Sequence, residues 1–126
     1  MRAVDTNVLV RLIVRDDAKQ ASAAEEFIAK GAWVSLLVLI EAMWVLDSVY
    51  ERTAQQIGMA VEMLLNHEQL TIQDAEVVAI TLQQFAGRPT LGFSDCLVLE
   101  VARKAGHLPV GTFDRDFAKL PGMQRL

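Results

Sequence analysis

Short apolar runs alternate along this chain with longer segments in which apolar residues recur every three to four positions. A run of three or four apolar residues is typical of a buried strand, and a period of 3.6 predicts a helix that buries one face. Strands are expected over residues 2–4, 32–35, 70–72, 108–111 and 123–126. Helices are expected over residues 7–14, 18–30, 36–50, 53–66, 74–85, 93–105 and 114–120. This alternation predicts an α/β sandwich in which helices flank a mostly parallel central sheet.

The length and continuity of the chain predict a single domain. Its 126 residues contain no linker, repeat or low-complexity segment, so we expect one domain over residues 1–126. A domain of this size buries about two-thirds of the surface of its unfolded chain. Hydrophobic residues make up 52% of the sequence, which is above the usual share. The chain therefore has enough apolar residues for a full core and for a subunit interface.

Several features indicate a cytoplasmic protein without a membrane segment. The only cysteine is Cys96, which excludes an internal disulfide framework and favours a small buried apolar residue in a reducing compartment. The apolar N-terminus is interrupted by Asp5 and lacks the long apolar region of a signal peptide. No apolar run reaches the roughly 18 uncharged residues that a membrane span needs.

The net charge of −4 bears on the kind of nucleic-acid partner that is expected. A module that binds RNA through phosphate contacts alone is usually basic, so the charge disfavours that class. An enzyme with an acidic metal site is not disfavoured, because the bound cations supply positive charge where the phosphate lies.

Two aspartates follow predicted strands directly. Asp5 follows the first strand and Asp114 the fourth. Ligands of open parallel sheets bind beyond the carboxyl ends of the strands, so this placement brings both acids to the same edge. Each also has a purely structural interpretation, because aspartate is a favoured N-cap and a helix follows each of them. Ser94 or Asp95 is a cap candidate for the helix that ends at residue 105, by the same reasoning.

Glu41 is harder to explain by structure alone. Its neighbours three and four positions away on the predicted helix are all apolar, namely Leu37, Val38, Trp44 and Val45. We therefore expect its carboxylate at the rim of the core or inside it, where an unpaired charge costs several kcal/mol. No lysine or arginine lies within helical reach, so the functional interpretation is a carboxylate that is held for a cation.

The acids taken together indicate a metal site. Converging carboxylates repel one another, and a fold tolerates them when divalent cations lie between them. Mg²⁺ and Mn²⁺ prefer such oxygen ligands. Ions of this kind activate water and neutralise a phosphodiester transition state, which favours hydrolysis of a phosphodiester bond.

The motifs around these acids resemble those of the PIN domain family, and within it the VapC-type toxins of bacterial toxin–antitoxin pairs. The resemblance covers nearly the whole chain. It rests on four segments in order: VDTNVLVRLIVRDDAKQ with Asp5, SLLVLIEAMWVL with Glu41, FSDCLVLEVARKAG with Asp95, and GTFDRDFAKLPG with Asp114 and Asp116. Any one of these segments alone is a weak signal, whereas their order and spacing make the resemblance specific.

This resemblance implies a PIN-like three-layer sandwich and endoribonuclease activity that depends on Mg²⁺ or Mn²⁺. It implies Asp5, Glu41, Asp95, Asp114 and Asp116 as the catalytic and metal-binding acids. It further implies a homodimer and a cognate antitoxin protein that neutralises the toxin. The positions of Thr6, Asn7 and Ser35 match residues that support the site through hydrogen bonds.

Arg11 and Arg15 are candidates for RNA contacts. They lie four residues apart on the first predicted helix, which starts at Asp5. One interpretation is that they guide RNA phosphates toward the metal ions. The other is a solvated helix face or an antitoxin contact.

Three other classes of protein are alternatives to this interpretation. A haloacid-dehalogenase-like phosphatase needs a second aspartate two residues after the first, where this chain has Asn7. A Toprim-like enzyme would use Asp114 and Asp116 as its acidic pair, but its glutamate should follow the first strand, where this chain has Asp5. A non-catalytic RNA- or protein-binding module with the same fold would be recognised by the loss of a motif acid, and none is lost.

Overall fold

The computed structural model describes residues 1–88 and 90–126. It divides into an N-terminal unit, Met1–Ala75, and a C-terminal unit, Glu76–Leu126. The described residues form five strands in two parallel sheets, with three strands in the N-terminal unit and two in the C-terminal unit. The predicted α/β class is therefore confirmed, and each unit has its own parallel sheet.

The sheet of the N-terminal unit has the order β1-β2-β3. Its strands are β1 (Arg2–Ala3), β2 (Ala32–Val34) and β3 (Leu70–Ile72), and Ala32 pairs with Arg2 on one side and Leu70 on the other. Parallel neighbours need a crossover connection, and here each crossover is a pair of helices. The first pair is α1 (Thr6–Val14) and α2 (Ala18–Ile28), and the second is α3 (Leu36–Ser48) and α4 (Ala54–Leu65).

Polar side chains fix the start of each of these four helices. Asp5 caps α1, Asp17 caps α2 and Ser35 caps α3, in each case by accepting a backbone N–H from the first turn. Thr53 and Gln56 form a reciprocal capping box at the start of α4. Such caps satisfy N–H groups that have no partner within the helix, which explains why the helices begin at these residues.

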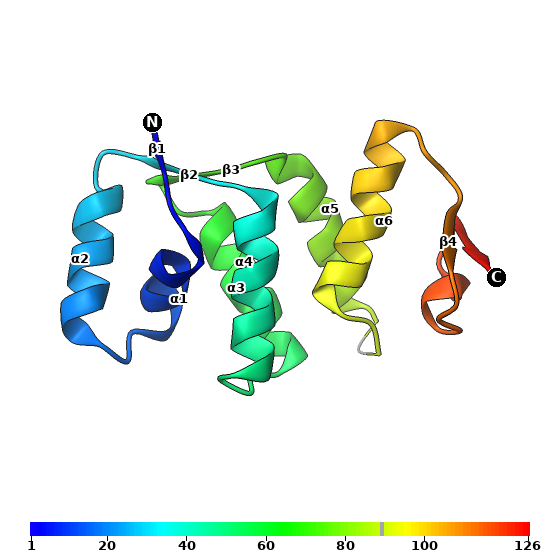
Figure 1. Ribbon diagram of the computed structural model, residues 1–126, viewed down its shortest axis with the longest axis horizontal. Helices are drawn as coiled ribbons and strands as arrows, with labels where there is room; N and C mark the ends of the chain where they lie inside the picture. Colours follow the sequence, from blue (N-terminus) through cyan, green and yellow to red (C-terminus); the bar gives the residue numbers. More distant parts are fainter. Residues whose placement is uncertain (89) are drawn as a thin grey trace. The chain divides into compact units, whose positions relative to one another are not determined.

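Helix α1 lies at the centre of the packing in this unit. It buries Leu9, Val10 and Leu12 and packs against both α2 and α3 (Figure 1). Helix α3 is apolar on nearly every side but buries only one face, which consists of Leu39, Ala42, Met43 and Leu46. Apolar side chains on the other side of α3 are therefore left exposed.

The C-terminal unit contains α5 (Ala75–Ala86), which begins at the last residue of the N-terminal unit, and α6 (Phe93–Ala105). Strand β4 (Val110–Thr112) pairs in parallel with β5 (Met123–Arg125), and the short 3₁₀ helix η1 (Phe117–Lys119) lies between them in sequence. Phe85 and Phe93 pack edge to face, with ring centroids 5.8 Å apart. This contact ties the end of α5 to the start of α6.

Gly122 is the position in this unit where a side chain fits worst. Its φ of +95° is a left-handed conformation, and an added Cβ would lie 3.2 Å from the Arg103 guanidinium and 3.3 Å from Leu99. Glycine is therefore required for the turn that leads into β5.

Most predicted elements agree with the structure, and two predictions were wrong. The strand expected at 108–111 is observed at Val110–Thr112, and the helix expected at 114–120 is only the 3₁₀ turn Phe117–Lys119. The second error arises because backbone N–H groups at 116 and 117 bond to the Asp114 side chain instead of starting an α-helix. None of the described helices is long and apolar enough to cross a membrane.

Candidate active site

Asp5 lies one residue after Val4, which continues the β1 pairing through its N–H bond to the Trp33 carbonyl (3.1 Å). Its Oδ1 atom accepts the backbone N–H of Val8 at 3.2 Å, so the capping role is confirmed. The other oxygen, Oδ2, accepts no hydrogen bond from any described residue, and the side chain is exposed. The cap therefore holds this carboxylate in place and leaves one oxygen available to a ligand.

Glu41 is joined to the first motif by a hydrogen bond. The hydroxyl of Thr6, which follows Asp5 directly, donates to Glu41 Oε2 at 2.7 Å. Packing of α1 against α3 makes this contact possible. The first and second motifs are thus brought together at the N-terminal end of α1, although they are 35 residues apart in sequence.

The expected burial of Glu41 was wrong. Its side chain is exposed, and so are its helical neighbours Leu37 (71%) and Trp44 (66%). Helix α3 is apolar beyond the one face that the unit can bury, so apolar neighbours did not indicate a core position. The partner of the carboxylate is the Thr6 hydroxyl rather than a basic residue.

Ser35 and Asn7 differ in what they contact. The Ser35 hydroxyl accepts the N–H of Val38 at 3.1 Å and so starts α3 at the end of β2. Asn7 is exposed, and its side chain bonds to no described residue. Sequence reasoning missed Gln73, whose side-chain oxygen accepts the N–H of Leu36 at 2.9 Å. This bond ties the end of β3 to the start of the helix that carries Glu41.

Asp95 lies half-buried in the first turn of α6. The N-cap position is held by Gly92, and no side chain caps this helix. The predicted cap by Ser94 or Asp95 was therefore wrong, because the helix begins earlier, at Phe93. A negative charge in a first turn is still favourable, since the N-terminal end of a helix carries partial positive charge. Burial, followed by the nearby charge of Asp95, raises the pKa of the Cys96 thiol.

Asp114 and Asp116 have different partners. Asp114 Oδ1 accepts the backbone N–H groups of Asp116 (2.8 Å) and Phe117 (3.0 Å), and its own N–H donates to the Thr112 hydroxyl. Asp116 instead forms an ion pair with Lys119 at 3.4 Å. Asp114 is therefore fixed by the turn with one oxygen outside it, whereas Asp116 already has a cationic partner.

The motif acids are distributed over both units. Asp5 and Glu41 belong to the N-terminal unit, and Asp95, Asp114 and Asp116 belong to the C-terminal unit. Within each unit, the described residues include no group of three His, Cys, Asp or Glu side chains placed to hold a metal ion. The donor set itself fits Mg²⁺ or Mn²⁺, because every donor is a carboxylate oxygen and both Asp5 and Asp114 keep one oxygen outside their caps.

Comparison with known proteins decides the family. A sequence model of the PIN domain matches residues 2–123. The chain belongs to the PIN domain family. It is also 29% identical over 125 residues to a VapC ribonuclease from Aquifex aeolicus (strain VF5), an alignment that covers 95% of this chain and 92% of that protein. No solved structure matches the chain.

The two arginines that were predicted to contact RNA are ion-paired in this PIN domain. Arg11 contacts Asp16 at 2.6 Å and the Tyr50 hydroxyl at 3.4 Å, and the Tyr50 bond is the main cause of a raised Arg11 pKa. Arg15 is paired with Glu25 and caps the end of α1 in a left-handed conformation. A phosphate that binds either arginine would compete with these carboxylates.

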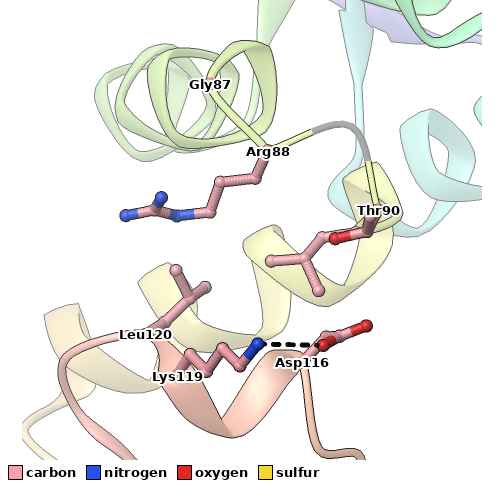
Figure 2. A pocket seen from close by; sticks show the side chains of 7 residues that line it. Gly87, Arg88, Thr90, Asp116, Lys119 and Leu120 are labelled. Atoms are coloured by element: carbon pink, nitrogen blue, oxygen red, sulfur yellow. Dashed lines mark ion pairs between the residues drawn. The ribbon is translucent and has the colours of Figure 1, made fainter.

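Two other basic residues of the PIN domain were missed by sequence reasoning. Arg88 and Lys119 line a pocket of about 270 Å³ in the C-terminal unit, together with Thr90 and Asp116 (Figure 2). Arg88 lies outside the four motifs and Lys119 lies within the fourth, and the two are 31 residues apart in sequence. Their proximity results from the fold, so the sequence carries no direct signal for it.

Proposed function

We propose that this PIN domain, residues 1–126, is a metal-dependent endoribonuclease that hydrolyses RNA phosphodiester bonds. We further propose that it is the toxin of a type II toxin–antitoxin pair. The proposal is supported by the family, by the VapC ribonuclease to which the chain is similar, and by the presence of all motif acids.

The structural observation that carries the proposal is the hydrogen bond from Thr6 to Glu41 (2.7 Å). It holds an exposed glutamate beside the exposed, capped Asp5, and nothing in the packing of α3 requires a carboxylate there. Exposed acids that are fixed by hydrogen bonds but lack a basic partner suit a cation.

In the proposed site, Asp5, Glu41, Asp95 and Asp114 hold Mg²⁺ or Mn²⁺, and Asp116 is a fifth candidate. The chemistry supplied by a bound ion is neutralisation of phosphodiester charge and activation of the attacking water. The chain itself orients the ligands: the α1 cap holds Asp5, Thr6 holds Glu41, and the turn before η1 holds Asp114. Preorganised ligands of this kind lose little entropy when a cation and substrate bind.

We propose a cognate antitoxin and a homodimer as partners, in the cytoplasm. The antitoxin is supported by the exposed apolar side chains of Leu37 and Trp44, which flank Glu41 on α3. A protein segment that covered them would also cover Glu41 and so block the site. Further exposed apolar residues, including Val49, Met59 and Ile80, supply surface for a dimer. Sedimentation of the purified protein tests the dimer, because a monomer at micromolar concentration would contradict it.

We propose Arg11 and Arg15 as candidate RNA contacts, in which a phosphate competes with their carboxylate partners. Replacing both with glutamine should then weaken RNA binding and flatten its dependence on salt. An unchanged salt dependence would leave only their ion pairs with Asp16 and Glu25 as their role.

Titration with Mn²⁺ tests the metal site. Asp5→Asn and Asp95→Asn should each weaken Mn²⁺ binding strongly and abolish RNA cleavage. Asp17→Asn is the matched control, because Asp17 caps α2 as Asp5 caps α1, with a bond of 3.0 Å to the Gln20 N–H. Asparagine caps a helix about as well as aspartate, and Asp95 caps no helix, so all three variants should stay folded. Wild-type Mn²⁺ affinity in Asp5→Asn, or an equal loss in Asp17→Asn, would contradict the assignment.

A further inference from the structure

The pocket in the C-terminal unit has an apolar base and a charged rim. Leu91 and Leu120 line it and are nearly fully buried, with 6% and 3% of their surface exposed. Figure 2 shows Arg88 and Thr90 on the side of the α5–α6 connection, with Asp116 and the η1 residue Lys119 on the opposite side. The cavity of about 270 Å³ therefore has basic groups on both sides.

Arg88 is held by its backbone while its side chain lacks a partner. Its N–H donates to the Phe85 carbonyl (3.1 Å), and its carbonyl accepts the N–H of Leu91 (3.1 Å). Among residues 1–88 and 90–126, no side chain forms a hydrogen bond or ion pair with its guanidinium. A guanidinium presents a rigid fork of donors that matches phosphate oxygens. The position is thus fixed for a ligand that the chain itself does not supply.

Lys119 has only a weak partner. Its ion pair with Asp116 spans 3.4 Å between side chains that are 70% and 52% exposed, and exposed pairs of this kind contribute little. Arg88 and Lys119 carry two positive charges against the one negative charge of Asp116, so the pocket is basic on a chain whose net charge is −4. By contrast, Arg11 and Arg15 already have closer carboxylate partners.

We propose that this pocket binds a backbone phosphate of the RNA substrate, through Arg88 on one side and Lys119 on the other. The inference rests on the proposed ribonuclease function and adds a substrate contact to it. Asp116 then acts as a positioning residue, which orients Lys119 until RNA binds. The pocket lies beside the turn that fixes Asp114, since Asp116 lines the pocket and donates its backbone N–H to Asp114 Oδ1.

RNA binding measured without divalent metal tests the pocket. The probe is a fluorescein-labelled single-stranded oligoribonucleotide, and its affinity is followed by anisotropy between 50 and 200 mM KCl. Each phosphate contact to a single strand contributes about 0.7 to the slope of log K against log salt. Because both side chains contact the same phosphate, the Arg88→Gln/Lys119→Gln variant should lose about 0.7 from that slope, so that its affinity falls about 2.6-fold less over this range.

Lys30→Gln/Arg52→Gln is the control, because it removes the same charge from side chains that form no ion pair in the described part of the chain. Its slope should stay close to that of the wild type. An unchanged slope in Arg88→Gln/Lys119→Gln, or an equal decrease in the control, would overturn the proposal.

Asp116→Asn gives an effect of opposite sign, because it removes the anion that competes with phosphate. It should strengthen RNA binding, and weaker binding would also overturn the proposal.

Cleavage assays with Mg²⁺ separate this inference from the proposed function. If the Arg88→Gln/Lys119→Gln variant shows the expected loss of slope but the wild type never cleaves RNA, the ribonuclease proposal fails and the phosphate pocket stands. If the wild type cleaves RNA but the Arg88→Gln/Lys119→Gln variant keeps the wild-type slope, the pocket proposal fails alone. Thermal unfolding curves confirm that the variants are folded, and the single variant Arg88→Gln repeats the test with half the expected change in slope.

Discussion

Glu100 is a buried carboxylate in the third motif, and the structure predicts that its role is stability rather than catalysis. Its side chain is 5% exposed and lies 3.3 Å from Arg103 Nε, and it accepts a hydrogen bond from Gln84 Nε2 at 2.9 Å. Arg103 also donates to the Pro121 carbonyl at 2.9 Å. Glu100 therefore connects α5, α6 and the turn before β5.

The cost of Glu100→Ala follows from three losses. The Gln84 amide, which is partly buried, loses its acceptor at a cost of about 1 kcal/mol. One buried methylene is removed, which costs about 0.8 kcal/mol. The Arg103 pair is discounted to about 0.5 kcal/mol, because that guanidinium is 40% exposed and partly screened by water. The free energy of unfolding should fall by about 2 kcal/mol.

Glu100→Gln separates the charge from the packing. It keeps the methylenes and an oxygen that can accept from Gln84, so its loss of stability should stay below about 1 kcal/mol. Urea unfolding at pH 7 measures both variants. With a slope of about 2 kcal/mol per molar urea, Glu100→Ala should lower the midpoint by about 1 M. A decrease below about 0.2 M, or loss of RNA cleavage in folded Glu100→Gln, would refute the structural role.

Three further predictions concern the site and the core. Thr6→Val removes the donor to Glu41 and should lower cleavage about 10- to 100-fold, whereas Thr6→Ser should keep most activity; equal rates in both would contradict a positioning role. Ser35→Ala removes the α3 cap and should cost about 0.5–2 kcal/mol in urea unfolding, against no change for the exposed Ser22→Ala. Burial raises the pKa of Cys96 above its ordinary 9.0, so the folded state disfavours the thiolate. The stability that comes from keeping this thiol protonated is complete below pH 9.0 and is lost as the pH rises further. Cys96→Ala should therefore remove this part of the alkaline decrease in the free energy of unfolding.

The sequence predicted the elements whose signals are local. Helix α6 at Phe93–Ala105 and strand β3 at Leu70–Ile72 were predicted with the bounds that the structure has. Apolar periodicity and a Gly106 stop define α6, and these act within a few residues. The prediction of the final helix was wrong because the Asp114 side chain competes for the backbone N–H groups of the next turn. Composition does not reveal which of these hydrogen bonds forms.

The site was predictable only where it depends on motif positions. The candidate acids follow from the positions of the four motifs, and their role in the site stays a prediction. The exposure of Glu41 did not follow, because an apolar helix can leave some of its apolar residues exposed, as it does Leu37 and Trp44. The Thr6–Glu41 bond depends on tertiary packing, and so does the placement of Arg88 and Lys119 on opposite sides of one pocket. No spacing rule links those residues in sequence.

Analysis of the ends of cleaved RNA tests the central claim most directly. Purified protein is incubated with a labelled single-stranded RNA in Mg²⁺ or in EDTA, with Glu41→Gln as the variant that keeps the side-chain size but removes the charge. Attack by water on a phosphodiester at a carboxylate–metal site leaves a 5′-phosphate and a 3′-hydroxyl. The account predicts these ends in Mg²⁺, and no cleavage in EDTA or by folded Glu41→Gln. Cyclic phosphate ends, or full activity in EDTA, would contradict it.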